Sequence, residues 1–121
     1  MMATSTKEEL RTKHCRPCEG GTPPLTCDEA RHHLEELDGW DLTDGGASIR
    51  REWELKNFAA GMAFLVRVAA IAEREQHHPE LHLTNYRHVV IELTTHAIGG
   101  LSENDFIVAA KIDEIPVKLK Q

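Results

Sequence analysis

Residues 57–79 read NFAAGMAFLVRVAAIAEREQHHP, and this stretch decides the predicted fold. Its apolar residues recur at spacings of three and four, which is typical of an amphipathic helix. They form a stripe that includes Phe58, Met62, Leu65, Val66, Ala69 and Ala72. Asn57 can cap the first turn, whereas Pro79 cannot continue a helix and favours an extended conformation at the residue before it. The pattern therefore predicts a long helix from Phe58 to about Gln76.

Shorter elements flank this helix on both sides. Before it we expect a helix from residue 26 to about 37, and then strands at 40–43 and 47–55. After it we expect strands at 81–84 and 88–94, and a last helix that starts after Ser102 and ends near Pro116. This order indicates an α+β domain, with three helices on one face of a four-stranded antiparallel sheet (α-β-β-α-β-β-α).

Local signals mark where these elements start and turn. Thr26 with Glu29, and Ser102 with Asp105, have the spacing of a capping box, in which two side chains satisfy the first amides of a helix. The run Asp44-Gly45-Gly46 between the first two strands is a hairpin signal. Each boundary therefore has a local physical reason.

One folded domain should span residues 25–116, between an irregular extension at 1–24 and a tail at 117–121. The extension holds Cys15-Arg16-Pro17-Cys18 after His14, but the second cysteine pair of a zinc knuckle is missing. We interpret the motif as a loop, with a metal or redox role as the alternative. Three cysteines are too few to staple a fold, and they suit a reducing compartment.

Composition argues against several classes of function. Of 121 residues, 40% are apolar and 28% are charged, which is the balance of a globular protein. No apolar run approaches the roughly 18 to 20 residues of a membrane span, and the first residues match neither a signal peptide nor a transit peptide. We therefore expect a cytoplasmic protein with no membrane partner. The net charge of −6, without a basic stripe, argues against nucleic-acid binding.

Histidine is the unusual component, with eight residues, five of them from His77 to His96. His77 and His78 follow the long helix, and His96 follows the strand at 88–94. Imidazole titrates near neutral pH, so these three residues are candidates for acid–base catalysis. Glu73, one turn before His77, could orient that imidazole and favour its protonated form. The alternative is an ordinary surface pair.

A metal site is the main alternative for these histidines, because histidine and carboxylate can hold zinc or iron. The usual helical pattern, two histidines four residues apart around a glutamate, is absent. His32-His33 and His77-His78 are adjacent pairs instead, and adjacent side chains point in different directions. We therefore predict a site without a metal, and a metal stays the alternative.

The combination of motifs resembles one known family. It consists of Glu73-x-x-x-His77-His78-Pro79-Glu80, then Tyr86, Thr94-Thr95-His96 and Gly99-Gly100-Leu101-Ser102-x-x-Asp105. The chain resembles the pterin-4a-carbinolamine dehydratases from about Leu25 to Ile115. Its Glu80–Tyr86 segment and its Cys-Arg-Pro-Cys-Glu-Gly-Gly extension resemble a branch of the family found in bacteria, plastids and protozoa.

The resemblance implies a cofactor-free hydro-lyase of tetrahydropterin recycling. Its substrate would be the 4a-hydroxy-tetrahydropterin that aromatic amino acid hydroxylases release, and its product the quinonoid dihydropterin. His77 and His96 would form the proton-transfer pair, and His78 with Glu73 would hold the pterin.

The resemblance also assigns roles to four further residues. Trp40 would form part of the pocket wall, main-chain groups around Thr94 and Thr95 would bind the pterin ring, and Asp105 would be an acid near the site. Each of Trp40 and Asp105 also has a purely structural interpretation, as a core aromatic and as a capping residue.

Not every role in this family is catalytic. One is a dimerisation cofactor for a transcription factor, and a related group assists Rubisco assembly. Neither role needs the histidine triad, so its presence favours the enzyme. Family members form dimers or tetramers by joining sheet edges and packing helices, and a small antiparallel sheet has edges to cover. We expect a homodimer or homotetramer.

Overall fold

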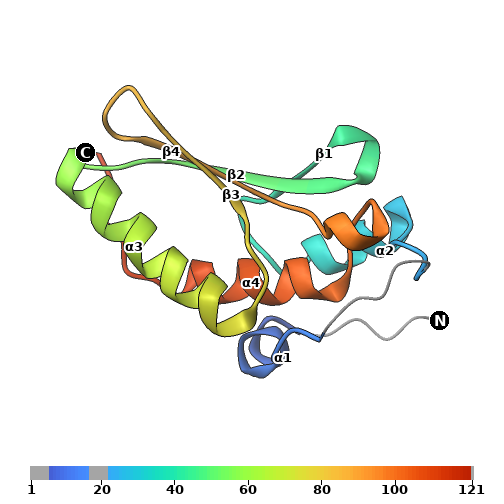
Figure 1. Cartoon of the computed structure of the whole chain (residues 1–121). Coiled ribbons are helices and arrows are strands. Elements are labelled where there is room, and N and C mark those ends of the chain that lie inside the picture. The colour runs from blue at the N-terminus through green and yellow to red at the C-terminus, as the bar shows by residue number, and fades with distance from the viewer. Residues whose placement is uncertain (1–5, 17–21, 121) are drawn as a thin grey trace.

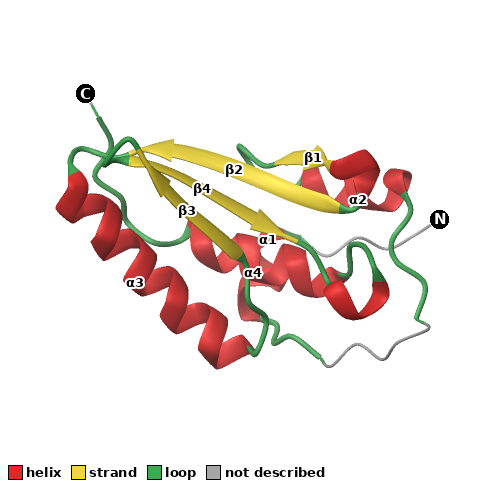
Figure 2. Cartoon of the chain, turned by 45° about the horizontal axis from the view of Figure 1, so that its top comes forward, coloured by secondary structure: helices red, strands yellow, loops and turns green. Residues whose placement is uncertain are grey.

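A four-stranded antiparallel sheet forms one layer of the molecule, and helices cover one of its faces (Figures 1 and 2). The computed structural model describes residues 6–16 and 22–120. The strands are β1 Asp41–Thr43, β2 Ser48–Glu54, β3 Glu80–Thr84 and β4 His88–Leu93, in the spatial order β1-β2-β4-β3. The helices are α1 Lys7–Thr12, α2 Cys27–Leu34, α3 Phe58–Glu75 and α4 Glu103–Asp113. The predicted α+β class is confirmed.

Helix starts lie where the capping signals place them. The Asn57 side chain accepts a hydrogen bond from the Ala60 amide at 2.8 Å, at the start of α3. Complete capping boxes begin α2 and α4, at Thr26 and Ser102 respectively. These three predictions are confirmed because a cap depends only on residues within one turn of chain.

The buried face of α3 differs from the predicted stripe. Phe58, Met62 and Val66 are 53%, 43% and 65% exposed. The side that packs into the molecule carries Gly61, Phe64, Val68, Ile71, Ala72 and Glu75. Because α3 is apolar around most of its circumference, periodicity alone does not select the side that the sheet covers.

The N-terminal extension is not wholly irregular as predicted, because it contains the helix α1. Thr6 and Glu9 form a capping box that begins α1, and the Leu10 side chain is fully buried. Helix α1 packs against α4, on the side away from the sheet (Figure 1). One buried residue in six gives no apolar periodicity, so the capping-box spacing of Thr6 and Glu9 was the available sequence signal for this helix.

The C-terminal tail is also part of the fold. The Lys56 amide donates to the Lys118 carbonyl at 2.8 Å, and the Lys120 amide donates to the Glu54 carbonyl at 2.9 Å. These bonds place the tail beside the end of β2. Among the described helices, none has both the length and the apolar character to cross a membrane.

The core lies between the sheet and α4. Eight of the eleven residues of α4 are buried, which makes it the central helix of the helical layer. The inward-facing residues of the two middle strands include Ile49, Trp53, Val89, Ile91 and Leu93. This close packing fixes the start of α4 relative to the ends of α3 and β4, where the candidate residues lie.

Candidate active site

All three predicted histidines line one cavity of about 640 Å³. Its walls come from the end of α3, the end of β4, the start of α4 and the segment before residue 17. The lining residues are His14, Cys15, Arg16, Arg74, Glu75, Gln76, His77, His78, Thr94, Thr95, His96, Ala97 and Asn104. This volume is in the usual range for small-molecule pockets. Another cavity, of about 440 Å³ near the start of α3, has no histidine or carboxylate among its described lining residues.

The end of α3 directs His77 and His78 into this cavity. Gln76 adopts the left-handed conformation, with φ 54° and ψ 39°, and its side-chain amide donates to the Glu73 carbonyl at 2.7 Å. The helix therefore stops at Glu75, and Pro79 prevents its continuation further on. His77 and His78 lie in the short extended link between α3 and β3.

His96 arrives from a different part of the chain. It begins a single 3₁₀ turn, His96–Ile98, just after β4. Gly99 closes that turn at φ 68°, a conformation that glycine adopts without steric cost. The isolated bridge between Thr95 and Gly100 holds the base of the turn. The end of β4 and this turn thereby bring His96 to the cavity that the end of α3 also lines.

A buried carboxylate holds His77. The distance from His77 Nε2 to Asp105 Oδ1 is 2.6 Å, and the Asp105 side chain is fully buried. The second oxygen of Asp105 accepts from the Thr95 hydroxyl at 2.8 Å and from the Ser102 amide at 3.0 Å. An ionised carboxylate can only accept, so this pair places the proton of a neutral His77 on Nε2 and leaves Nδ1 as an acceptor.

The predicted pairing of Glu73 with His77 is wrong. Because Gln76 turns the chain out of the helix, His77 no longer lies one turn after Glu73. Glu73 Oε2 is instead 3.4 Å from His78 Nε2, and the two side chains are 74% and 59% exposed. An ion pair this exposed contributes at most about 1 kcal/mol. The orienting carboxylate of His77 is Asp105.

Comparison with known proteins assigns the chain to a family. The sequence profile described as pterin 4 alpha carbinolamine dehydratase matches residues 23–115. The chain belongs to this family. A protein of Nitrosospira multiformis whose name places it in the same family is 50% identical over 111 residues, which cover 92% of this chain and 96% of that protein. The Arabidopsis thaliana protein named pterin-4-alpha-carbinolamine dehydratase 2, mitochondrial, is 47% identical over 91% of this chain and 60% of its own length.

Solved structures agree with this assignment. The transcriptional coactivator/pterin dehydratase from Brucella melitensis has a TM-score of 0.70 and 36% identity, covering 74% of this chain and 95% of its own. A pterin dehydratase-like protein described as a RuBisCO assembly factor of the α-carboxysome has a TM-score of 0.54 and 24% identity, covering 68% of this chain and 90% of its own. The second likeness shows the fold alone.

Not every residue expected in the pterin dehydratase site contacts the cavity. Trp40 is buried in the core, where its indole N–H donates to both carboxylate oxygens of Asp113 at 3.0 Å. Burial raises the pKa of Asp113, although Trp40 and the Arg51 guanidinium oppose that rise. Within one chain, Trp40 therefore has the structural role and is not part of the cavity wall. Asp105 and Glu73 are not among the lining residues and contact His77 and His78 respectively.

Thr94 and Thr95 both line the cavity. The Thr94 hydroxyl donates to the Ala47 carbonyl at 2.6 Å, and the Thr95 hydroxyl is bonded to Asp105. The Thr95 amide also donates to the Gly100 carbonyl at 2.9 Å. Both side chains therefore help to hold the site together, and each hydroxyl, whose proton is already used, can only accept a hydrogen bond from a ligand.

Sequence reasoning missed the contribution of the N-terminal segment to this dehydratase-family site. His14, Cys15 and Arg16 line the cavity. The motif around Cys15 was the available signal, but its spacing suggested only a loop. Its position depends on contacts with Glu75 and Asn104, which lie 60 and 88 residues away in the chain. No local pattern encodes contacts of that kind.

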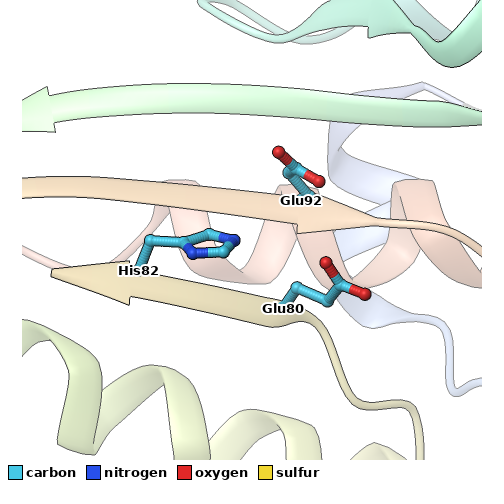
Figure 3. A group of neighbouring side chains, drawn as sticks. All are labelled: Glu80, His82 and Glu92. Carbon is cyan, nitrogen blue, oxygen red and sulfur yellow. The ribbon is translucent and has the colours of Figure 1, made fainter.

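The one group of possible metal ligands found among the described residues lies on β3 and β4, and two of its members, Glu80 and Glu92, line a small pocket of about 130 Å³ together with His78 and His96. Glu80, His82 and Glu92 project from β3 and β4, with ligand atoms within 4.8 Å of one another (Figure 3). Glu80 and His82 are exposed, and Glu92 is 3.6 Å from the Arg50 guanidinium. None of the three cavity histidines belongs to this group. The arrangement of the three cavity histidines fits proton transfer, with a carboxylate behind one imidazole and two further imidazoles lining the same cavity.

Proposed function

We propose that this chain catalyses the dehydration of a 4a-hydroxy-tetrahydropterin to the quinonoid dihydropterin, in tetrahydropterin recycling. The observation that carries the proposal is the His77–Asp105 pair on a cavity that His78 and His96 also line. Family membership supplies the substrate class, and the site supplies groups of the right chemistry for it.

The reaction requires one proton to be added and one to be removed. The N5 lone pair forms a double bond to C4a while the bond between C4a and the hydroxyl oxygen breaks. Hydroxide is a poor leaving group, so an acid must protonate it as it departs as water. A base then takes the proton from N5. The products are water and the quinonoid dihydropterin, and no electrons are exchanged with a cofactor.

We assign the two proton transfers to His77 and His96, which reach the cavity from separate elements. Asp105 orients the His77 ring, as a buried carboxylate does for a catalytic histidine. His78, steadied by its exposed contact with Glu73, holds the pterin ring. Each proton transfer of this kind typically contributes about 10²- to 10⁴-fold to the rate.

The competing hypothesis is a non-catalytic interaction or assembly role, in Rubisco assembly or as a transcriptional dimerisation cofactor. The 24% identical assembly factor shares the fold, which alone does not transfer its role to this chain. An assembly role gives no reason for three imidazoles and a buried carboxylate around one cavity. The site therefore favours the enzyme.

We also propose a cytoplasmic homodimer or homotetramer. The support is physical: β1 and β3 are open sheet edges, and Phe58, Met62 and Val66 form an exposed apolar row on α3. Open edges and exposed apolar rows are commonly covered by self-association.

The test of the proposed activity is the rate of dehydration of a freshly generated 4a-hydroxy-tetrahydropterin. The purified chain should accelerate the reaction well beyond the spontaneous rate, in proportion to the protein concentration. A rate equal to the spontaneous one, with protein that is folded by circular dichroism, would exclude the enzyme and leave the assembly role.

A further inference from the structure

The N-terminal segment Thr6–Arg16, which we call the strap, is tied to both elements that form the His77–Asp105 pair. We propose that the strap completes the ligand-binding wall of the histidine cavity and, through Glu75 and Asn104, holds that pair in place. The substrate class in this inference rests on the proposed function. The strap precedes the family match at residues 23–115, so the match does not assign it a role.

Glu75 makes the first attachment, at the end of α3. Its side chain is fully buried, and its oxygens accept from the Cys15 amide at 2.8 Å and contact His14 Nδ1 at 3.1 Å. Lys111 of α4 lies 3.4 Å away. Burial disfavours the charge of Glu75, yet these three contacts together hold its pKa below the usual range. Because a buried carboxylate needs such partners, the Glu75 side chain holds the end of α3 to the strap.

Asn104 makes the second attachment, at the start of α4. Its side-chain oxygen accepts from the Arg16 amide at 3.0 Å, and its side-chain NH₂ donates to the Arg16 carbonyl at 2.6 Å. This reciprocal pair fixes the main chain of Arg16 in one register. Because both partners are main-chain groups of Arg16, the attachment does not depend on the Arg16 side chain.

The two attachment residues are neighbours of the proposed catalytic pair. Glu75 precedes His77 by two residues, and Asn104 immediately precedes Asp105. The strap therefore spans the gap between the end of α3 and the start of α4, across which His77 contacts Asp105 at 2.6 Å. Loosening either attachment would let these two ends move apart, and displacements near 1 Å at a catalytic group can cost about a hundredfold in rate.

Cys15 forms part of the cavity wall, and the reactivity of its thiol shows whether the strap stays in place. It lines the cavity, and its Sγ lies 3.6 Å from the Asn104 carbonyl. Burial, with the charges of Glu75 and Asp105, raises the pKa of Cys15 to about 12. Its thiol is therefore protonated and slow to alkylate at neutral pH. Cys27 is an exposed thiol on α2 and serves as an internal reference.

The first experiment compares Asn104→Ala and Glu75→Gln with Arg11→Gln. Arg11 belongs to the strap but forms a partly exposed ion pair with Glu114, away from the cavity, so Arg11→Gln is the matched control. The attachment variants should lower kcat/KM by about ten- to hundredfold relative to that control. They should also alkylate several times faster with iodoacetamide at Cys15, measured on its peptide by mass spectrometry, and not at Cys27.

The second experiment tests the wall directly with 7,8-dihydrobiopterin as the probe. In the wild-type protein this pterin should slow alkylation of Cys15 without affecting Cys27. Cys15→Leu adds bulk to the wall and leaves its main-chain amide on Glu75, so it should raise KM more than it changes kcat. Arg11→Gln, which lies in the strap but outside the wall, is its control.

The results separate the two proposals. If the wild-type chain catalyses dehydration but the attachment variants match Arg11→Gln, and the pterin leaves Cys15 unprotected, the strap inference is wrong and the enzyme stands. If the wild-type chain shows no dehydration, the proposed function is wrong. In that case the strap is tested by alkylation alone. If Asn104→Ala is folded and its Cys15 alkylates at the wild-type rate, the proposed attachment is wrong as well.

Discussion

At the scale of single residues, His77 differs from the other histidines in what holds it. His78 and His96 line the same cavity, but His77 alone among the three has a fully buried carboxylate 2.6 Å from its ring. The exposed contact of His78 with Glu73 is longer, at 3.4 Å, and is screened by solvent. We therefore expect the carboxylates of Asp105 and Glu73 to differ sharply in their contribution to kcat.

The corresponding prediction compares Asp105→Asn with Glu73→Gln. Asp105→Asn keeps the shape of the side chain but loses the charge that orients His77, so kcat should fall by about 10² to 10⁴. Glu73→Gln should change kcat less than about threefold, because exposed pairs contribute little. Steady-state dehydration kinetics measure both, with thermal unfolding to confirm that each variant folds. A larger loss in Glu73→Gln than in Asp105→Asn would contradict the assignment of Asp105.

At the scale of elements, the end of α3 sets the direction of His77 and His78. Gln76 holds the left-handed conformation at φ 54°, which disfavours residues with a side chain and most strongly those branched at Cβ. The predicted Glu73–His77 pair does not form because α3 ends before His77. Had Gln76 kept the helical conformation, the two side chains would lie one turn apart.

Substitution of Gln76 should reveal this strain. Gln76→Gly should keep the activity and change stability by no more than about 1 kcal/mol, because glycine adopts this conformation freely but loses the side-chain bond to the Glu73 carbonyl. Gln76→Val should destabilise by about 1–3 kcal/mol and lower activity, because its backbone is held in an unfavourable region. Urea unfolding and the dehydration assay measure the two effects. Equal stability of the valine and glycine variants would show that the turn is not strained.

The same scale explains what could be predicted from the sequence. The caps at Asn57, Thr26 and Ser102 were predictable because each depends on neighbours three residues away. The convergence of His77, His78 and His96 was suggested by their positions at element ends and by the family resemblance. Asp105 was expected near the site, but its contact with His77 spans 28 residues and depends on how α4 packs. The strap, held through separations of 60 and 88 residues, left no periodic or capping signal that pointed to the cavity.

At the scale of the whole molecule, the strap makes stability depend on pH through Glu75. The folded-state pKa of Glu75 lies below its ordinary value of 4.5, so folding favours its ionised form. Such a group contributes stability that is present above the unfolded pKa and is lost as pH falls through the folded one. The groups that face it are the Cys15 amide, His14 and Lys111.

The free energy of unfolding of wild type and Glu75→Gln should therefore converge at acid pH. The wild type should be more stable at pH 7, and the difference should shrink below about pH 4.5 and vanish as pH falls further. Taking the difference between variants cancels the other carboxylates. A difference that stays constant from pH 7 to pH 3 would show that the charge of Glu75 does not stabilise the fold.

Also at this scale, removal of metal ions should leave the dehydration rate unchanged. The cavity histidines are not part of the Glu80, His82 and Glu92 group, and proton transfer needs only imidazoles of suitable pKa (Figure 3). The rate is measured after dialysis against a chelator and again after addition of zinc. A rate that falls with the chelator and returns with zinc would contradict the mechanism, and loss of that response in His82→Ala would locate the ion.

The most direct test of the central claim is the dehydration rate of three single variants, His77→Ala, His78→Ala and His96→Ala, beside His88→Ala. His88 pairs with Glu52 on β2, outside the cavity, and is the control. The account predicts that kcat falls by about 10² to 10⁴ in His77→Ala and His96→Ala, that His78→Ala mainly raises KM, and that His88→Ala matches the wild type. Full turnover in both His77→Ala and His96→Ala would contradict histidine acid–base catalysis at this site.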